Sequence, residues 1–296
     1  MLLTPRITRR TVLKRLAAGA ALAAAGAGRM PAFAQTPPPA AAALKGRIRQ
    51  GVCPGAFGKA PLSFAQKCEF CAKIGIKGMD FIGADDWPTL KQYGLICTLT
   101  RSHGLAKGIN HKENHAECLA AIRSGIEASA AAGYPNVICL SGLRAGISDE
   151  AGADNCVEAL KQVAALAEEK KVTLCLELLN SKRNHPDYQC DRTAWGVGVC
   201  KRVGSPRVKL LYDIYHMQVQ EGDVIATLKE FMPYIGHFHT AGVPGRHEID
   251  ESQELYYPAI MRAIAELQYA GYVSHEYTPT KDPLQSLTQA VQICDV

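Results

Sequence analysis

The chain has 296 residues, with 33 Lys and Arg against 28 Asp and Glu. Six of the basic residues and none of the acidic ones lie in residues 1–34, so the remaining 262 residues carry 27 basic and 28 acidic side chains, a net charge of −1. A nearly neutral domain lacks the basic surface that binds a polyanion, so we expect no nucleic-acid partner. A length near 260 residues is typical of one closed barrel.

The first 34 residues predict an export signal. The pair Arg9 and Arg10 forms a twin-arginine pattern, an Ala, Gly and Leu run follows, and Ala32-Phe33-Ala34 provides a cleavage site. The apolar run is shorter than the roughly 20 residues that span a bilayer, so we expect no stable membrane anchor. We therefore expect residues 1–34 to be a signal peptide and the twin-arginine export machinery to deliver the protein to the periplasm.

Residues 35–45 are rich in Pro and Ala and predict a linker. After it, short apolar runs alternate with longer helical patterns, which favours a parallel sheet. Eight such units in one chain of this length predict a single (β/α)8 TIM barrel over residues 46–296. The predicted strands are 48–53, 77–82, 95–99, 136–140, 173–178, 208–213, 234–239 and 272–276.

Seven longer helices are predicted between and after these strands, with a short one at 87–93. Gly75, Gly133 and Gly271 follow helical runs, where a glycine at positive φ commonly ends a helix. The predicted longer helices are 63–74, 116–132, 150–171, 192–203, 223–232, 257–269 and 283–293.

Active sites of such barrels lie at the carboxyl ends of the strands. The last four predicted strands end in Glu177, Asp213, His239 and Glu276. Three carboxylates and one imidazole are a ligand set for a divalent cation, with Mn²⁺ or Mg²⁺ expected. Any one of these residues alone could instead form a rim ion pair, but all four together predict a metal site.

Other polar residues lie near these strand ends. His237 shares a face with His239 and could orient ligands, whereas His275 is expected to point into the barrel wall. His216 and Arg246 follow the sixth and seventh strands and are candidate substrate contacts. The alternative for Arg246 is an ion pair with Glu248 or Asp250 in its own loop.

Three motifs resemble the hydroxypyruvate isomerase branch of the xylose-isomerase-like barrel superfamily, which contains sugar isomerases, epimerases and endonuclease IV. They are residues 211–223 (LYDIYHMQVQEGD), 236–248 (GHFHTAGVPGRHE) and 271–277 (GYVSHEY). The resemblance extends from about Arg47 to the end of the chain. Gln often stands in that branch where this chain has His239, which leaves the substrate open.

The resemblance implies that Glu177, Asp213, His239 and Glu276 bind the metal. It also implies that Glu177 and Glu276 are catalytic and exchange protons with adjacent substrate carbons. His216 and Arg246 match positions that contact substrate.

The expected function is a divalent-metal-dependent isomerase or epimerase. Its substrate would be a small 2-hydroxycarbonyl compound or sugar, and its reaction a proton transfer through a metal-bound enediolate. Alternatives are a metal-dependent lyase or epimerase acting on a 3-keto glycoside and, in another class, a non-catalytic sugar-binding barrel. Assembly of identical chains is left open.

Cysteine is abundant, with 11 residues. Their spacings do not match zinc sites, and several lie in apolar runs. Because twin-arginine cargo folds before export, we expect small buried thiols rather than a disulfide framework.

Overall fold

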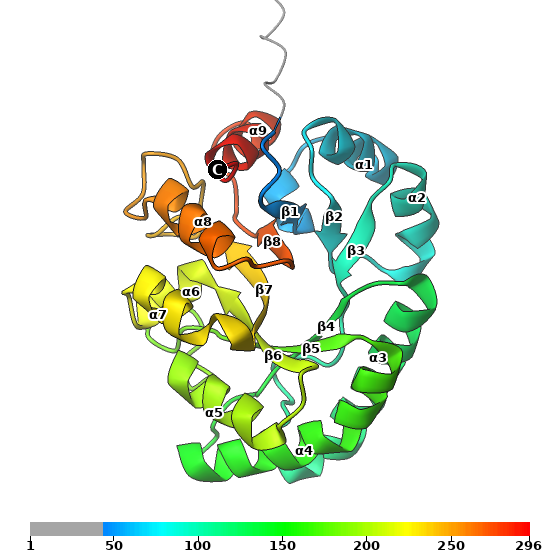
Figure 1. The fold of residues 1–296 in the computed structure, drawn as a ribbon, viewed down its shortest axis with the longest axis vertical. Helices are drawn as coiled ribbons and strands as arrows, with labels where there is room; N and C mark the ends of the chain where they lie inside the picture. The colour runs from blue at the N-terminus through cyan, green and yellow to red at the C-terminus, as the bar shows by residue number, and fades with distance from the viewer. Residues whose placement is uncertain (1–43) are drawn as a thin grey trace, which may run out of the picture. The chain divides into compact units, whose positions relative to one another are not determined.

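The computed structural model describes residues 44–296, which form a barrel of eight parallel strands with helices around it (Figure 1). The predicted (β/α)8 barrel is confirmed. The strands are β1 (Arg49–Val52), β2 (Gly78–Asp80), β3 (Ile96–Leu99), β4 (Asn136–Cys139), β5 (Thr173–Glu177), β6 (Val208–Asp213), β7 (Ile235–Thr240) and β8 (Tyr272–His275).

The strands follow the order β3-β2-β1-β8-β7-β6-β5-β4, and every pairing between them is parallel. The two end strands meet just past β3, where Thr100 and Val137 form a parallel bridge. There the Thr100 amide donates to the carbonyl of Asn136 at 2.9 Å, and the Ile138 amide donates to the carbonyl of Thr100 at 3.0 Å. These bonds bring the barrel close to closure.

Nine α-helices and four 3-10 helices connect the strands within the described residues. The α-helices are α1 (Phe64–Lys73), α2 (Trp87–Gln92), α3 (His115–Ala132), α4 (Asp149–Lys170), α5 (Thr193–Val203), α6 (Ile214–Gln220), α7 (Val224–Phe231), α8 (Tyr257–Glu266) and α9 (Pro283–Ile293). The 3-10 helices are η1 (Pro54–Phe57), η2 (Ala84–Asp86), η3 (Lys112–Asn114) and η4 (Met232–Tyr234). None of these described helices is long and apolar enough to cross a membrane.

Local sequence signals explain several helix ends. Ser63 and Gln66 form a reciprocal capping box at the start of α1, and the Ser148 side chain caps α4. Gly133 ends α3 at φ 76°, as predicted. The prediction for Gly271 was wrong, because α8 ends earlier than expected and Gln268 takes the positive φ instead.

The core lies between the sheet and its helices. All five residues of β5 are buried, as expected for a parallel sheet covered on both faces. All eleven cysteines lie in the described part of the chain, and all are buried and free. The expectation of buried thiols is therefore confirmed. The predicted signal peptide, and the predicted linker up to residue 43, lie outside the described residues.

Candidate active site

Four consecutive strands bring the predicted metal ligands together at one end of the barrel. Glu177 ends β5, Asp213 ends β6, His239 lies in β7 and Glu276 follows β8. One ligand atom from each of the four residues lies within 4.8 Å of the other three. Asp213 and His239 are fully buried, Glu177 is nearly so and Glu276 is half-buried.

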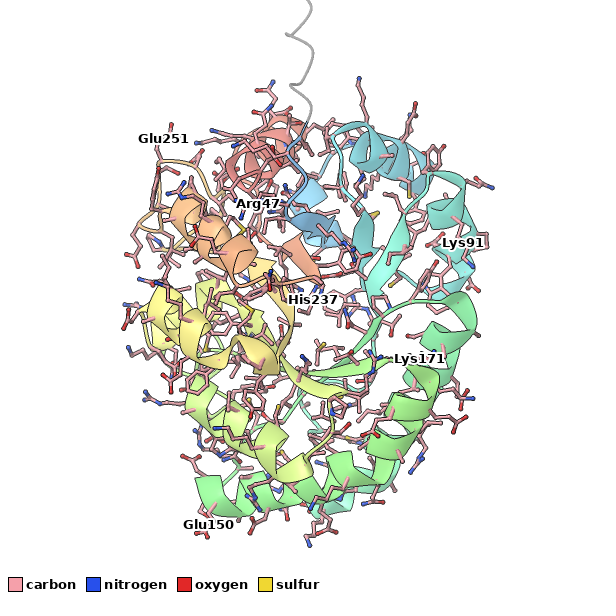
Figure 2. The ribbon with its side chains drawn as sticks, in the orientation of Figure 1. Arg47, Lys91, Glu150, Lys171, His237 and Glu251 are labelled. Atoms are coloured by element: carbon pink, nitrogen blue, oxygen red, sulfur yellow. The ribbon has the colours of Figure 1, made fainter. Side chains whose placement is uncertain are left out.

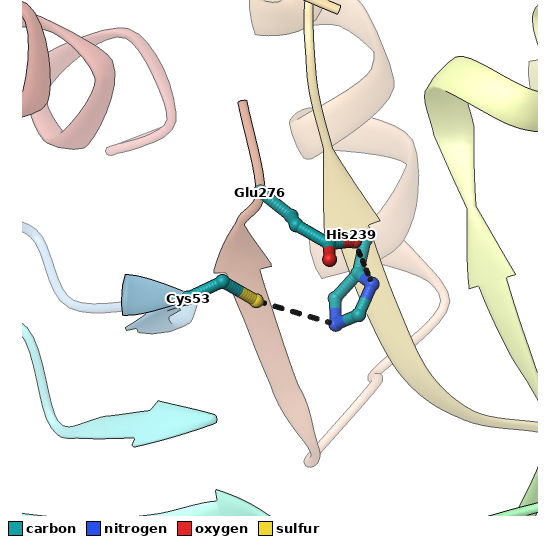
Figure 3. Close-up of side chains that lie close together, drawn as sticks. All are labelled: Cys53, His239 and Glu276. Atoms are coloured by element: carbon teal, nitrogen blue, oxygen red, sulfur yellow. Dashed lines mark hydrogen bonds and ion pairs between the residues drawn. The ribbon is translucent and has the colours of Figure 1, made fainter. Parts of the chain in front are cut away.

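His239 is the centre of this group, and Figure 3 shows its contact with one of the carboxylates, that of Glu276. Its Nδ1 atom lies 2.7 Å from Glu276 Oε2, 3.8 Å from Glu177 Oε1 and 4.0 Å from Asp213 Oδ2. Despite these short distances, Nδ1 has no partner with hydrogen-bond geometry among the described residues. This nitrogen therefore faces three carboxylates, and the nearest, Glu276, forms the ion-pair contact that Figure 3 marks with a dashed line.

Asp80, at the end of β2, fixes the other nitrogen of the same ring. Its Oδ2 atom lies 3.0 Å from His239 Nε2 and 2.8 Å from His237 Nε2. Figure 2 shows His237 on β7, at the inner side of the barrel. An ionised carboxylate only accepts hydrogen bonds, so His239 carries a proton on Nε2, and Nδ1 is the ring atom that could bind a metal ion.

Neighbouring side chains stabilise the negative charge on Asp80. Burial alone would raise the pKa of this carboxyl, but His237 and His239 hold it far below its ordinary value. Thr98 Oγ1 donates a further hydrogen bond to it. Sequence reasoning missed Asp80, because this residue lies inside the predicted strand 77–82, whereas the structure ends β2 there.

Cys53, immediately after β1, lies beneath the same imidazole. Its Sγ atom is 3.8 Å from His239 Nε2 (Figure 3). The same sulfur is 3.6 Å from Asp80 Oδ2. Burial and the carboxylate of Glu276 raise the pKa of this thiol well above its ordinary value. Cys53 therefore remains a protonated thiol, which makes it a packing neighbour of the site rather than a nucleophile.

Arg246 contacts the acidic group directly. Its Nη2 atom donates to Asp213 Oδ2 at 2.9 Å and to Glu276 Oε2 at 2.6 Å. The backbone of Arg246 is held at φ 60°, a conformation that is uncommon outside glycine. The alternative of an ion pair within its own loop is wrong, because Glu248 bonds to Thr280 and Ser286, and the backbone of Lys281, instead.

The two glutamates differ in charge state. Burial and the neighbouring Glu276 carboxylate raise the pKa of Glu177 to about 8. Burial also opposes the charge on Glu276, but His239 and Arg246 outweigh it and lower its pKa to about 2. His239 itself is held charged, because Glu276 outweighs the effect of burial and raises its pKa. Arg246 and His239 together do not supply enough positive charge to keep all three carboxylates ionised.

These observations fit a divalent cation. Three carboxylates converge on one imidazole nitrogen that lacks a hydrogen-bond partner, and a buried second carboxylate fixes the tautomer of that ring. Oxygen-rich sets with one imidazole suit Mn²⁺ or Mg²⁺ better than soft metals. Glu177, Asp213, His239 and Glu276 would hold the ion.

His216 is held as a hydrogen-bond donor beside this group. It lies in α6, a short helix that sequence reasoning missed and that Asp213 caps by accepting from the His216 amide at 3.1 Å. Asn180 donates to His216 Nδ1 at 2.6 Å from its side chain, so the proton of the neutral ring lies on Nε2. Burial lowers the pKa of His216 to about 4. Its Nε2 has no hydrogen-bond partner among the described residues and lies 3.7 Å from Asp213 Oδ2.

A cavity of about 450 Å³ opens onto the site. Glu177, Glu276 and Arg246 line one part of it, so the cavity reaches the predicted ligands and the predicted substrate contact. The remaining wall comes mainly from the loop that follows β3 and from the end of β4. That wall consists of Phe81, Arg101, Ser102, His103, Gly104, Leu105, Ile138, Leu140, Leu179 and His185.

A parallel barrel with this group of acidic residues at its strand ends defines a TIM-barrel protein with a candidate metal site. The family model described as Xylose isomerase-like TIM barrel matches residues 68–294, so the chain belongs to that family. The resemblance found in the sequence is thereby supported at the level of the family.

Curated relatives carry isomerase names. Hydroxypyruvate isomerase from Escherichia coli is 27% identical over 229 residues, which cover 73% of this chain and 88% of the relative. 2-Oxo-tetronate isomerase from Cupriavidus necator is 40% identical over 123 residues, 42% of this chain and 46% of the relative. The human protein named "Putative hydroxypyruvate isomerase" is 29% identical over 178 residues, 57% of this chain. This chain spans only 64% of that relative's length.

Solved structures show the same fold. The 3-keto-D-glucoside 4-epimerase from E. coli superposes with a TM-score of 0.71 at 20% identity, covering 83% of this chain and 98% of that one. An L-ribulose 3-epimerase superposes with a TM-score of 0.69 at 18% identity, covering 82% and 92% of the two chains. At these identities the likeness concerns the fold alone.

The position of Asp80 leads to a prediction about metal affinity. In Asp80→Asn the amide is neutral and brings an N–H group close to the two imidazoles, so His239 loses its charged acceptor. We expect Mn²⁺ to bind roughly 10- to 100-fold more weakly, measured by electron paramagnetic resonance titration. Asp85→Asn, an exposed carboxylate in η2, is the matched control. If Asp80→Asn is as stable as the control and binds Mn²⁺ like the wild type, Asp80 does not position His239.

Proposed function

We propose that this protein is a divalent-metal-dependent isomerase or epimerase that moves a proton between the carbons of a small 2-hydroxycarbonyl compound. One observation carries the proposal: two glutamates line the cavity and belong to the same four-residue group around His239 Nδ1. Neighbouring side chains that could bind substrate oxygens support it. His216 Nε2 and Arg246 Nε both lack partners among the described residues.

The metal, when bound, supplies Lewis acidity toward the carbonyl and hydroxyl oxygens of the substrate. The rest of the chemistry belongs to the chain's own residues. His216 donates its Nε2–H to a substrate oxygen and, being neutral, holds that oxygen without adding charge. Arg246 holds Asp213 and Glu276 in place from the cavity side.

The two glutamates provide the proton transfer. One carboxylate accepts the proton from the carbon next to the carbonyl, and the electron pair of the broken C–H bond moves toward the carbonyl oxygen. In an isomerisation, the hydroxyl proton moves to the former carbonyl oxygen while a proton returns to the former carbonyl carbon. In an epimerisation, the proton returns to the other face of the same carbon.

The names of the relatives support a small hydroxycarbonyl substrate. The relatives from E. coli and C. necator are named for hydroxypyruvate and 2-oxo-tetronate. Both compounds carry a hydroxyl group next to, or close to, a carbonyl carbon. Such compounds have an acidified C–H bond at the position where the glutamates would act.

The test is proton exchange in D2O, followed by proton NMR. Mn²⁺-loaded protein and metal-stripped protein are incubated with hydroxypyruvate, free ketoses and 3-keto glycosides. We expect metal-dependent loss of one carbon-bound proton signal from at least one hydroxycarbonyl compound. Glu177→Gln and Glu276→Gln should each reduce the rate by at least about 100-fold, because general acid–base catalysis contributes about 10²–10⁴.

Glu254→Gln is the control, since this exposed glutamate lies outside the acidic group. Exchange with 3-keto glycosides alone would favour the alternative reaction on an oxidised glycoside. Binding of a sugar without any proton exchange would contradict the proposed enzymatic function and favour a non-catalytic sugar-binding barrel.

We also propose that the protein is exported to the periplasm by the twin-arginine pathway. The sequence of residues 1–34 supports this. We expect the full chain, expressed in a bacterium and fractionated, to appear in the periplasm with Gln35 as its first residue by mass spectrometry. Replacing Arg9 and Arg10 by Lys should leave unprocessed protein in the cytoplasm, whereas Arg29→Lys should not. Unprocessed wild type in the cytoplasm would contradict export.

A further inference from the structure

The cavity beside the glutamates contains four basic side chains, and three of them are unsuited to bind an anion. Arg246 is already bonded to Asp213 and Glu276. His103 and His185 are largely neutral at neutral pH, because burial lowers the pKa of each. The fourth, Arg101, has no ion pair or side-chain hydrogen bond with the described residues.

Arg101 follows β3 and lines the same cavity as Glu177 and Glu276. Its guanidinium lies over the ring of Phe81, with Cζ 4.7 Å from the ring centroid. Stacking on an aromatic face fixes a guanidinium while leaving its N–H groups available at the edge. Arg101 is therefore an oriented but unneutralised cation in the wall of the candidate active site.

Phe81 links this cation to the metal site. Its backbone is held at φ 62°, which is unusual for an aromatic residue, and its amide donates to the carbonyl of Leu99 at 2.8 Å. The edge of its ring meets the His239 imidazole at a centroid distance of 6.0 Å. One aromatic ring thus separates the Arg101 guanidinium from the central ligand of the acidic group.

Charge balance also calls for such a cation. A divalent ion and Arg246 together would neutralise Glu177, Asp213 and Glu276. A neutral sugar entering this site needs no further charge. A substrate that carries a carboxylate does, because an uncompensated anion in a partly buried cavity is costly. Arg101 is the residue placed to compensate it.

We propose that Arg101 binds the carboxylate of an acidic substrate, so that the site selects small hydroxy-oxo acids over neutral sugars. This inference rests on the proposed function and names its substrate class. The carboxylate would bind the guanidinium edge while the reacting carbons lie beside the two glutamates. Hydroxypyruvate and 2-oxo-tetronate, for which relatives are named, are both carboxylic acids.

The test uses an unreactive acid and its uncharged analogue. Binding of glycerate and of glyceramide, the amide of the same acid, is measured by calorimetry on Mn²⁺-loaded protein. We expect the wild type to prefer glycerate. Arg101→Gln should weaken glycerate binding by roughly 10- to 100-fold and leave glyceramide unchanged, because a hydrogen-bonded ion pair is lost. Arg101→Lys should restore part of the affinity, since it keeps the charge but not the planar fork.

Arg262→Gln is the matched control, because Arg262 is also exposed and also stacks on an aromatic ring, that of Tyr256, but on the outer helix α8. Equal glycerate affinity in the wild type and Arg101→Gln would overturn the inference. So would a wild type that does not prefer glycerate to glyceramide. If that preference is present while no hydroxycarbonyl compound exchanges protons in D2O, the carboxylate site stands and only the proposed reaction fails.

Discussion

The site depends on the crowding of carboxylates around one imidazole. Glu177, Asp213 and Glu276 all approach His239 Nδ1, and this arrangement is stable only with positive charge among them. In the metal-free protein that charge comes from His239 and from Arg246, which bridges Asp213 and Glu276. The pKa of Glu177, raised to about 8, shows that this compensation is incomplete. A divalent cation would supply the missing positive charge, and the arrangement therefore indicates a metal site.

The barrel creates this crowding by ending consecutive parallel strands at one rim. β5 to β8 each deliver one ligand, and β2 delivers Asp80 to the far side of the His239 ring. Asp213 has a second role, since its side chain also caps α6 and so places His216 beside the same group. Phe81 and Arg246 both have positive φ, and both line the cavity. Unusual backbone conformations therefore occur where side chains must be aimed at the site.

Strands and strand-end residues were predictable because buried parallel strands read as short apolar runs, and the last residue of each run lies at the rim. Glu177, Asp213, His239 and Glu276 were found in this way. His275 likewise lies buried in the wall, bonded to Gln50 and Thr240, as expected. Asp80 fell inside the predicted strand 77–82, whereas β2 ends at this residue. Helix α6 has only seven residues, too few for a strong periodic signal. The stacking of Arg101 on Phe81 depends on the left-handed backbone of Phe81, which no local sequence pattern predicts.

The central claim is that Glu177, Asp213, His239 and Glu276 bind one divalent cation. The most direct measurement is the anomalous diffraction of Mn²⁺ in crystals grown with that ion. The account predicts a single strong peak among the four side chains. Two other groups of residues could compete for the ion: Cys53 with His239 and Glu276, and Asp80 with His237 and His239. A peak at either of those groups, or no peak within the barrel, would contradict the account.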